Sequence, residues 1–556
     1  MRLDTIHKTV NRKTYTSHLL RQAYRKNGKV RHRTIANLTN CPDDEIEAIR
    51  LALKHKGDLT QLASLKNDLV TKQGLVIGAV FTLWTVAKRL GIVAALGTSQ
   101  DAKQAAWQVL ARVIDQGSRL SAVRLAGTHA ACDVLGLQGF NEDDLYTNLD
   151  WLHEHQTEIE NRLFRRRHPD GKAKLFLYDV TSSYLEGVKN ELGAFGYSRD
   201  KKTGKLQIVI GLLCDEEGWP LSIEVFPGNT TDTKTFGSQV RKVAQRFGGG
   251  SVTFVGDRGM IKGPQIDLLG EQKDDDFHYI TAITKPQIEK LLKRKVLQRE
   301  LFEETVAEVT DSDESVRYVV RRNPLRAAEV SGTRESKFAS LEALVRKENG
   351  YLGEHPRATV AAAVRRVEAK VTKLRLSSWV SVASQERTLS LVRDGEALAE
   401  EANLDGCYCL KTDLDKAMAS KELVHDRYKD LAKVEWVFRT CKTVHLELRP
   451  VNVRKETRTR GHAFVVMLAY LIVRELTECW QKLDLTVEEG IKELSSLCMD
   501  EVTIKDETTI HQIPQPRETL AQLIEAADVE LPPVLPYSGT RVYTRKKLTS
   551  ERKAND

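Results

Sequence analysis

The sequence predicts an α/β protein whose core is interrupted by an inserted α+β subdomain. Three observations predict this class. Strand-like and helix-like segments alternate between residues 171 and 284. A core-type strand and two helices follow at residues 404–480. The segment between them, residues 285–403, has strand and helix patterns of its own and is too long for a loop.

The composition is that of an ordinary globular protein, with 556 residues, of which 41% are hydrophobic and 29% are charged. This length suits several domains, and the apolar fraction excludes a largely disordered chain. Lys88 and Arg89 interrupt the most apolar stretch, residues 75–96, which predicts a core helix and no membrane span. The eight cysteines form no Cys-x-x-Cys pair, so we expect Cys407 and Cys409 to be buried side chains in a reduced, cytoplasmic protein.

The amino-terminal segment, residues 1–58, predicts a basic β-hairpin followed by a helix. Residues 14–25 and 30–38 alternate as strands around an Asn-Gly turn, and Pro42 opens the helix. The first 40 residues contain ten Lys or Arg side chains and one acid. This excess suits a polyanion such as DNA, although a charged sheet edge explains it equally well. The candidate DNA-binding side chains of the hairpin are Arg25, Lys26, Lys29, Arg31 and Arg33.

Residues 59–170 have a helical pattern throughout, and we expect this region to bind DNA or to mediate dimerisation. Apolar side chains between Leu83 and Val93 keep a helical period. The region closes on three arginines at 165–167, and a turn follows at 169–171. A domain boundary is therefore predicted near residue 170.

The segment from 171 to 284 has the element order of an RNase H-like catalytic core. A strand ending at Asp179 precedes a hairpin, a helix, a second strand ending before Asp257, a short helix and a further strand. The second part of this core, residues 404–480, would carry the last catalytic helix. Residues 481–556 are expected to form a helical region and a basic tail.

Asp179, Asp257 and Glu435 are the candidate catalytic and metal-binding residues. Both aspartates follow apolar strand runs, and in open α/β sheets sites form at the carboxyl ends of strands. Alone, each would more often be structural, because Asp favours turns. With a glutamate on a later helix, they predict a site for two Mg²⁺ or Mn²⁺ ions. Two such ions about 3.5–4 Å apart can drive cleavage of a phosphodiester.

The helix around Glu435 carries two further candidates. Tyr428, Glu435 and Lys442 are spaced by seven, so a single helix over residues 420–442 would place them on one face. Tyr428 and Lys442 would then hold phosphates while Glu435 binds metal. The competing interpretation is an ordinary exposed helix face. A basic run that could follow a DNA backbone or be a solvated loop comes next: Arg449, Arg454, Lys455, Arg458 and Arg460.

These motifs resemble the DDE transposases of bacterial insertion sequences, in the superfamily with a Tyr-x2-Arg-x3-Glu-x6-Lys signature. The resemblance covers residues 174–476 and, more weakly, the hairpin. It rests on Asp179 within Tyr-Asp-Val-Thr and on Asp257 within Gly-Asp-Arg-Gly, together with the last helix. Pro-Gly-Asn at 227–229, with Asp232 beyond it, is similar to a further block of that family.

One position departs from the signature. Its Arg is Leu431 here, so a neighbour such as Arg427 or Arg439 would have to hold the end of the element. Arg258, next to the second aspartate, is another candidate DNA contact. In relatives with a β-rich insert, a tryptophan can stack on a flipped base. Trp379 is the candidate for that role, although a buried core tryptophan is the competing interpretation.

The resemblance implies a DNA transposase with two divalent ions per active site. It would bind the terminal inverted repeats of an insertion sequence, cleave the DNA at their ends and join the 3′-OH ends to target DNA. We expect a homodimer acting on double-stranded DNA in the bacterial cytoplasm, associated with the nucleoid, with no membrane partner and no small-molecule substrate. Two alternatives are an RNase H-like metal-dependent nuclease without strand transfer and a non-catalytic, domesticated DNA-binding transposase.

Overall fold

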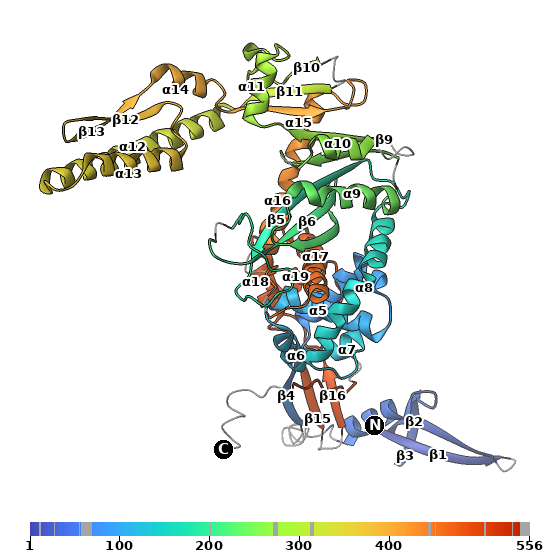
Figure 1. The fold of residues 1–556 in the computed structure, drawn as a ribbon. Helices are drawn as coiled ribbons and strands as arrows, with labels where there is room; N and C mark the ends of the chain where they lie inside the picture. Colours follow the sequence, from blue (N-terminus) through green and yellow to red (C-terminus); the bar gives the residue numbers. More distant parts are fainter. Residues whose placement is uncertain are drawn as a thin grey trace.

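The structure is a computed structural model of the 556-residue chain (Figure 1). It describes residues 1–10, 13–26, 28–54, 56, 69–200, 202–248, 250–258, 260–270, 276–311, 316–442, 446–450, 452–504, 508–535 and 538–544. No helix within these ranges is long and apolar enough to cross a membrane. Most of the predicted basic tail lies outside the described residues.

Three strands, not two, form the amino-terminal sheet. They are β1 (Arg2–Val10), β2 (Lys13–Lys26) and β3 (Lys29–Asn37), all antiparallel. The predicted hairpin is β2–β3, in which Lys26 pairs with Lys29 and Gly28 has a φ of 75°, a value that favours glycine. β1 was missed because its apolar residues do not alternate with a period of two. The expected helix follows as α1 (Asp43–Lys54).

The next region is mainly helical, as expected, but it begins with a strand. Strand β4 (Leu69–Val76) pairs with β15 (Cys498–Ile504), which in turn pairs with β16 (Thr508–Gln512). The prediction of helix throughout 59–170 is therefore wrong at β4. The helices that follow are α3 (Gly78–Arg89), α4 (Ile92–Leu96), α5 (Gln100–Ile114), α6 (Arg119–Thr128), α7 (Ala131–Leu135) and α8 (Glu142–Arg167).

A mixed eight-stranded sheet forms the centre of the molecule, in the order β10-β11-β14-β9-β8-β5-β6-β7. Strand β8 runs parallel to β5 and β9, and the other pairs are antiparallel. The α/β class is thereby confirmed. The strands are β5 (Leu175–Tyr184), β6 (Gln207–Asp215), β7 (Pro220–Pro227), β8 (Ser251–Gly256), β9 (Asp276–Ala282), β10 (Ala307–Asp311), β11 (Val316–Arg322) and β14 (Cys407–Thr412).

Strand β5 is buried on both faces, because alternate side chains enter two different cores. Phe176 and Tyr178 pack with the aromatic residues beneath α9 (Asp232–Arg246) and α10 (Gly263–Gly270). Leu175 and Leu177 enter the larger core, which also contains residues of α16 (Leu431–Lys442) and α17 (Glu456–Cys479). Asp179 has the parity of the second set, so its side chain faces α16.

The insert divides into two structural parts. Strands β10 and β11 extend the central sheet through β14, and α11 (Lys285–Lys293) packs near them. The rest has a hydrophobic core of its own and projects from the sheet in Figure 1. Its elements are α12 (Pro324–Glu354), α13 (Val360–Leu374), β12 (Val380–Gln385), β13 (Thr388–Arg393) and α14 (Gly395–Ala402).

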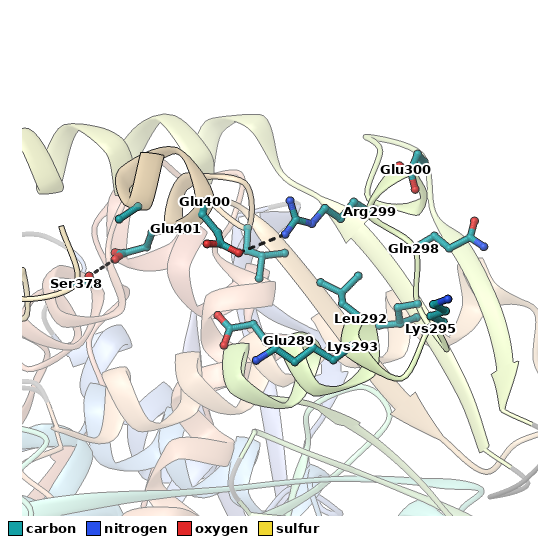
Figure 2. A pocket seen from close by; sticks show the side chains of 13 residues that line it. Glu289, Leu292, Lys293, Lys295, Gln298, Arg299, Glu300, Ser378, Glu400 and Glu401 are labelled. Carbon is teal, nitrogen blue, oxygen red and sulfur yellow. Dashed lines mark hydrogen bonds and ion pairs between the residues drawn. The ribbon is translucent and has the colours of Figure 1, made fainter. Parts of the chain in front are cut away.

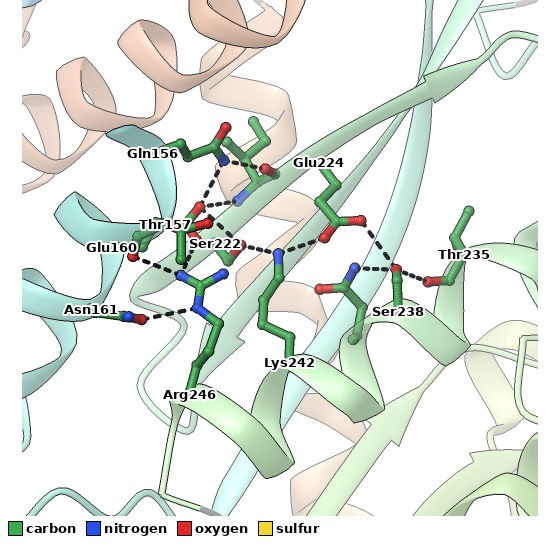
Figure 3. Close-up of polar contacts among 12 residues, drawn as sticks. Gln156, Thr157, Glu160, Asn161, Ser222, Glu224, Thr235, Ser238, Lys242 and Arg246 are labelled. Carbon is green, nitrogen blue, oxygen red and sulfur yellow. Dashed lines mark hydrogen bonds and ion pairs between the residues drawn. The ribbon is translucent and has the colours of Figure 1, made fainter. Parts of the chain in front are cut away.

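A buried polar network joins α8 to the central sheet (Figure 3). Glu160 of α8 is 1% exposed and accepts hydrogen bonds from Gln156 and Ser222 at 2.8 and 2.9 Å. Arg246 of α9 lies 2.7 Å from the same carboxylate. Because all three partners come from the protein, this charge is compensated inside the fold.

The carboxyl-terminal region is not only helical. Helices α18 (Val487–Leu494) and α19 (Glu518–Ala526) are present, as predicted for residues 481–556. Between them lie β15 and β16, which complete the sheet with β4 and were not predicted. Strand β4 is thus paired with a strand of the carboxyl-terminal region that lies more than 400 residues later in the sequence.

Candidate active site

Parallel pairing of β5 with β8 brings Asp179 and Asp257 side by side. Tyr178 of β5 pairs with Gly256 of β8, and the residue after each of them is one of the two aspartates. Asp257 directly follows β8, as expected, but Asp179 lies in the middle of β5, which continues to Tyr184. The prediction that the first strand ends at Asp179 is wrong, because the antiparallel partner β6 extends it through the polar residues after Asp179.

The Asp179 carboxyl group is hard to ionise in this position. The pKa of Asp179 is raised to about 7, mainly by burial and to a smaller extent by the nearby carboxylates of Asp257 and Glu435. The backbone N–H of Val180, which donates to Asp179 Oδ1 at 2.8 Å, and the charge of Arg199 act in the opposite direction. Three acidic groups therefore act on one another electrostatically, an arrangement that a cation would relieve.

Tyr428 reaches this site from α15 (Lys421–Lys429). Its hydroxyl donates to Asp257 Oδ1 at 3.0 Å. Burial raises the pKa of Tyr428, and the charge of Asp257 adds to the effect, so the phenol stays protonated. Tyr428 thus holds one candidate metal ligand in the structure, a contact that was not predicted.

Glu435 lies on the exposed surface of α16, and Val434, Val437 and Phe438 bury the opposite side of that helix. Helix α16 contacts β5, which brings Glu435 near the aspartates. Within the described ranges, however, no three acidic, histidine or cysteine side chains lie close enough together to hold a metal ion as they stand.

The single helix predicted over 420–442 is two helices. Helix α15 ends at Lys429 and α16 begins at Leu431, with Asp430 between them. Leu431 is 8% exposed and packs in the large core, so its side chain does not face DNA. A leucine fits there because the site is apolar.

The other predicted residues of these helices have partners within the protein. Lys442 donates to Asp200 Oδ1 at 2.8 Å. Arg427 reaches Glu216 at 3.3 Å. Arg439 lies over the ring of Trp436 at 5.7 Å, on the exposed side of α16.

The basic run after α16 is only partly available to DNA. Arg449 bonds to the hydroxyl of Tyr184 at 2.5 Å and pairs with acidic neighbours, while Arg458 and Arg460 are paired with Asp150 and Glu456. These three sites behave as structural ion pairs. Two exposed side chains of the run have no ion pair among the described residues: Arg454 and Lys455.

The remaining candidates lie away from the three carboxylates. Trp379 is 1% exposed and packs in the core of the inserted helical part, where Phe338 and Arg393 contact its ring. This burial agrees with the interpretation of a core tryptophan, and stacking on a base would require the side chain to leave that core. The basic residues of the amino-terminal sheet are all exposed: Arg25, Lys26, Lys29, Arg31 and Arg33.

A cavity of about 610 Å³ opens beside Asp179 and Asp257. Its other walls come from the block around Asn229 and Asp232 and from the segment between β5 and β6, which contributes Tyr197 and Arg199. Arg199 pairs with Asp232 at 2.5 Å. The block was noticed in the sequence, but Tyr197 and Arg199 were missed, because no local pattern shows that their loop folds back beside β5. Arg258, next to the second aspartate, also lines the cavity and was predicted as a DNA contact.

A larger cavity of about 760 Å³ lies between α11 and α14, at the base of the insert (Figure 2). Mixed charges line it, including Lys293, Arg299 and Glu400. Arg299 lies 3.8 Å from Glu400, and Ser378 donates to Glu401 at 2.7 Å. None of the three candidate carboxylates contributes to it, so the smaller cavity is the candidate active site.

Two family models match this chain. A family model described as the transposase DDE domain matches residues 170–472, more than half of the chain. A second, described as the IS1634 family transposase N-terminal domain, matches residues 3–64. No curated protein matches the chain.

Among solved structures, a cryo-EM structure of the piggyBac transposase synaptic complex with hairpin DNA is similar to this chain. It shares 11% identity over 77% of this chain and 70% of the other, with a TM-score of 0.34, which is too low to carry an argument. The family models, by contrast, match the same segments as the motifs and confirm the resemblance. The chain belongs to the DDE transposases of insertion sequences.

Proposed function

We propose that this transposase cleaves DNA at the ends of its insertion sequence and joins the freed 3′-OH ends to target DNA. One observation carries the proposal. The pairing of β5 with β8 sets Asp179 beside Asp257, and α16 brings Glu435 near them. Phosphoryl transfer needs such a cluster of hard oxygen ligands.

The strand order supports an RNase H-like core. Strands β5, β6 and β7 are neighbours in sequence and in the sheet, and β8 and β9 add on the other side of β5. This places the first strand of the core at its centre and both aspartates on central strands. Strands β10, β11 and β14 extend the same sheet beyond β9. The inserted subdomain that we propose for residues 285–403 would therefore contain two structural parts.

The three carboxylates fit divalent cations in their chemistry. The charges of Asp257 and Glu435 both raise the pKa of Asp179, which supports a space shared by the three side chains. Bound there, two Mg²⁺ or Mn²⁺ ions would activate the attacking hydroxyl and stabilise the charge that develops on the phosphate. Glu435 is exposed, so its side chain is free to turn toward the aspartates when the site is completed.

The surrounding residues would position the metal ligands and the DNA. Tyr428 orients Asp257 through its hydroxyl, so it would bind a phosphate only after giving up its hydrogen bond to Asp257. Lys442 would likewise exchange Asp200 for a phosphate. Arg258 and Arg439 are both exposed and would contact the DNA near the carboxylates. Arg427 would take the place of the signature arginine only by giving up its ion pair with Glu216.

DNA binding is assigned to the amino-terminal sheet and to the exposed cations near the carboxylates. The tip of β2–β3 presents five exposed basic side chains on a narrow ribbon that would fit a DNA groove. We propose terminal inverted repeats as its target, a homodimer as the active form and the bacterial cytoplasm as the location. The alternatives of a nuclease without strand transfer and of a non-catalytic DNA-binding protein are outcomes of the test below.

Single Asp179→Ala, Asp257→Ala and Glu435→Ala variants test the function on duplexes that carry the ends of the insertion sequence. We expect each variant to lose strand cleavage in Mg²⁺ while DNA binding stays within about twofold, because affinity comes mainly from phosphate contacts. Asp267→Ala, which removes an exposed carboxylate of α10, is the matched control. Cleavage without joining would identify a nuclease, and a wild-type protein that binds but never cleaves would identify the non-catalytic alternative.

The role of the amino-terminal sheet is tested by neutralising its tip. Replacing all five basic residues with Gln should weaken binding to end DNA and lower the slope of log K against log salt by up to about 4.5, at roughly 0.9 for each phosphate that is no longer neutralised. Because the side chains are exposed, the sheet should stay folded. A salt slope equal to that of the wild type would show that the charges only protect a sheet edge. The residues replaced are Arg25, Lys26, Lys29, Arg31 and Arg33.

A further inference from the structure

The segment between β5 and β6, residues 185–206, presents two exposed aromatic side chains beside the candidate active site. Phe195 is 68% exposed and Tyr197 is 83% exposed. Large aromatic side chains on a folded surface mark contacts with a partner more often than isolated small apolar ones do. Tyr197 also lines the 610 Å³ cavity that contains Asp179 and Asp257.

The described residues of this segment are held firmly in place. Asp200 bonds to Lys442 of α16 at 2.8 Å, and the backbone N–H of Arg199 donates to Ser182 of β5 at 2.9 Å. Nearer the start of the segment, the side chain of Asn190 donates to Thr459 of α17 at 2.8 Å. Because the chain is anchored on both sides of Tyr197, the position of this residue beside the cavity is a property of the fold.

The cavity also contains an unmet hydrogen-bond acceptor. Gln207 is 2% exposed and lines the cavity. Its Nε2 donates to the carbonyls of Tyr197 and Gly228 at 3.1 and 2.7 Å, which fixes the orientation of the amide. Its Oε1 has no hydrogen-bond partner among the described residues. A buried acceptor without a donor is costly, so an N–H group that reached it would be favoured.

The chemistry of the cavity matches a nucleotide. Tyr197 offers an aromatic ring on which a base could stack. Three cations line the same space and suit phosphate: Arg199, Arg258 and Lys262. The volume of about 610 Å³ is large enough for one nucleotide. The apolar alternative, a second copy of the chain, would bring no phosphate to these cations.

We propose that Tyr197 stacks on a nucleobase of the DNA strand next to the phosphate cleaved at Asp179 and Asp257, and that this unpaired base enters the cavity. The proposal rests on the proposed function, because it assumes that the carboxylates act on DNA. It adds a positioning residue outside the carboxylate cluster. Base–aromatic stacking tolerates any base, so Tyr197 would place the strand without reading its sequence.

The test measures equilibrium binding of the full-length protein to end duplexes, in chelator so that no cleavage occurs. One abasic nucleotide is placed at each successive position around the cleavage site. We expect wild type to bind the duplex with one particular abasic position roughly tenfold more weakly, the usual effect of removing one stacked base. Tyr197→Ala should bind the intact duplex about tenfold more weakly and show no further loss at that position. Tyr197→Phe should keep wild-type binding.

Tyr351→Ala is the matched control, since Tyr351 is an exposed tyrosine of α12 in the projecting part of the insert. Unchanged affinity of Tyr197→Ala for the intact duplex would overturn the stacking proposal. So would a variant that loses as much further affinity as the wild type at every abasic position. So would a shift of oligomeric state in Tyr197→Ala with DNA binding unchanged, which would assign the ring to a second copy. A wild-type protein that shows the stacking pattern but does not cleave in Mg²⁺ would instead refute the proposed function alone.

Discussion

Replacing Asp179 with Asn removes a carboxyl group whose ionisation the fold opposes. Burial raises the pKa of Asp179 from 3.8 to about 7, so the folded protein holds a proton that the unfolded chain has released. Between about pH 4 and pH 7 the folded state binds more protons, and its stability falls as pH rises. Above about pH 7 the full cost is present, and below about pH 4 it is absent. The amide of the Asp179→Asn variant does not titrate, so the variant would carry no such cost at any pH.

The size of the effect follows from the shift. A rise of roughly 3 pKa units corresponds to about 4 kcal/mol at 1.36 kcal/mol per unit. Because the carboxyl group borders an open cavity, solvent screening reduces this, and we expect about 2 kcal/mol. Asp179→Asn should therefore be more stable than wild type at about pH 8 in chelator and equally stable at about pH 4. Bound divalent metal should reverse the order at the higher pH, since the wild-type carboxylate is then a ligand.

Urea unfolding at about pH 4, 6 and 8, with chelator and with Mg²⁺, measures this difference. The unfolding signal should report on the central domain that contains Asp179, because a chain of this size need not unfold in a single step. Asp267→Asn, at an exposed position on α10, is the control and should show no pH-dependent gain. An Asp179→Asn variant that is no more stable than wild type at the highest pH, or whose gain is the same at the lowest, would refute the assignment of a buried, proton-retaining carboxyl group.

Three further substitutions test the packing around the site. Leu431→Arg should destabilise the protein by about 3 kcal/mol or more in urea unfolding, because it buries an unpaired charge. Leu431→Met should cost under about 1.5 kcal/mol. Equal stability of the two variants would show that position 431 is exposed. Arg246→Ala should cost about 3 kcal/mol by the same assay, because it leaves Glu160 buried without its cation, and exposed Arg241→Ala should be neutral. Tyr428→Phe should slow cleavage about tenfold while DNA affinity is kept, since it removes the hydroxyl that holds Asp257; a loss of affinity with unchanged cleavage rate would assign Tyr428 to a phosphate instead.

Local pattern was sufficient for much of the fold. The Asn-Gly turn between β2 and β3, the apolar runs of β5 and β8 and the amphipathic helices around them were all predicted close to their observed positions. Each of these signals is carried by neighbouring residues, as turn conformation or as hydrophobic period. The pairing of the two aspartates could be anticipated for the same reason, because the carboxyl ends of adjacent parallel strands meet at one edge of a sheet.

Elements whose stability depends on distant partners were not predictable. β4 has no strand signal that outweighs the helical region after it, and it forms because β15 supplies its hydrogen bonds from the other end of the chain. The strands β10 and β11 looked like part of the insert, but they complete the central sheet through β14. Strand pairing at such sequence separation depends on tertiary contacts, which the pattern of nearby residues does not contain.

The sequence by itself determined the chemistry of the protein: three carboxylates in order, a basic ribbon at the amino terminus and the motifs that place the chain among the DDE transposases. Only the tertiary structure decided how side chains around those motifs are used. Leu431 packs in the core, and Lys442 holds the 185–206 segment through Asp200. Helix rotation and loop placement follow from packing against elements far away in sequence, so the exposure of Tyr197 beside the carboxylates is visible only in the folded chain.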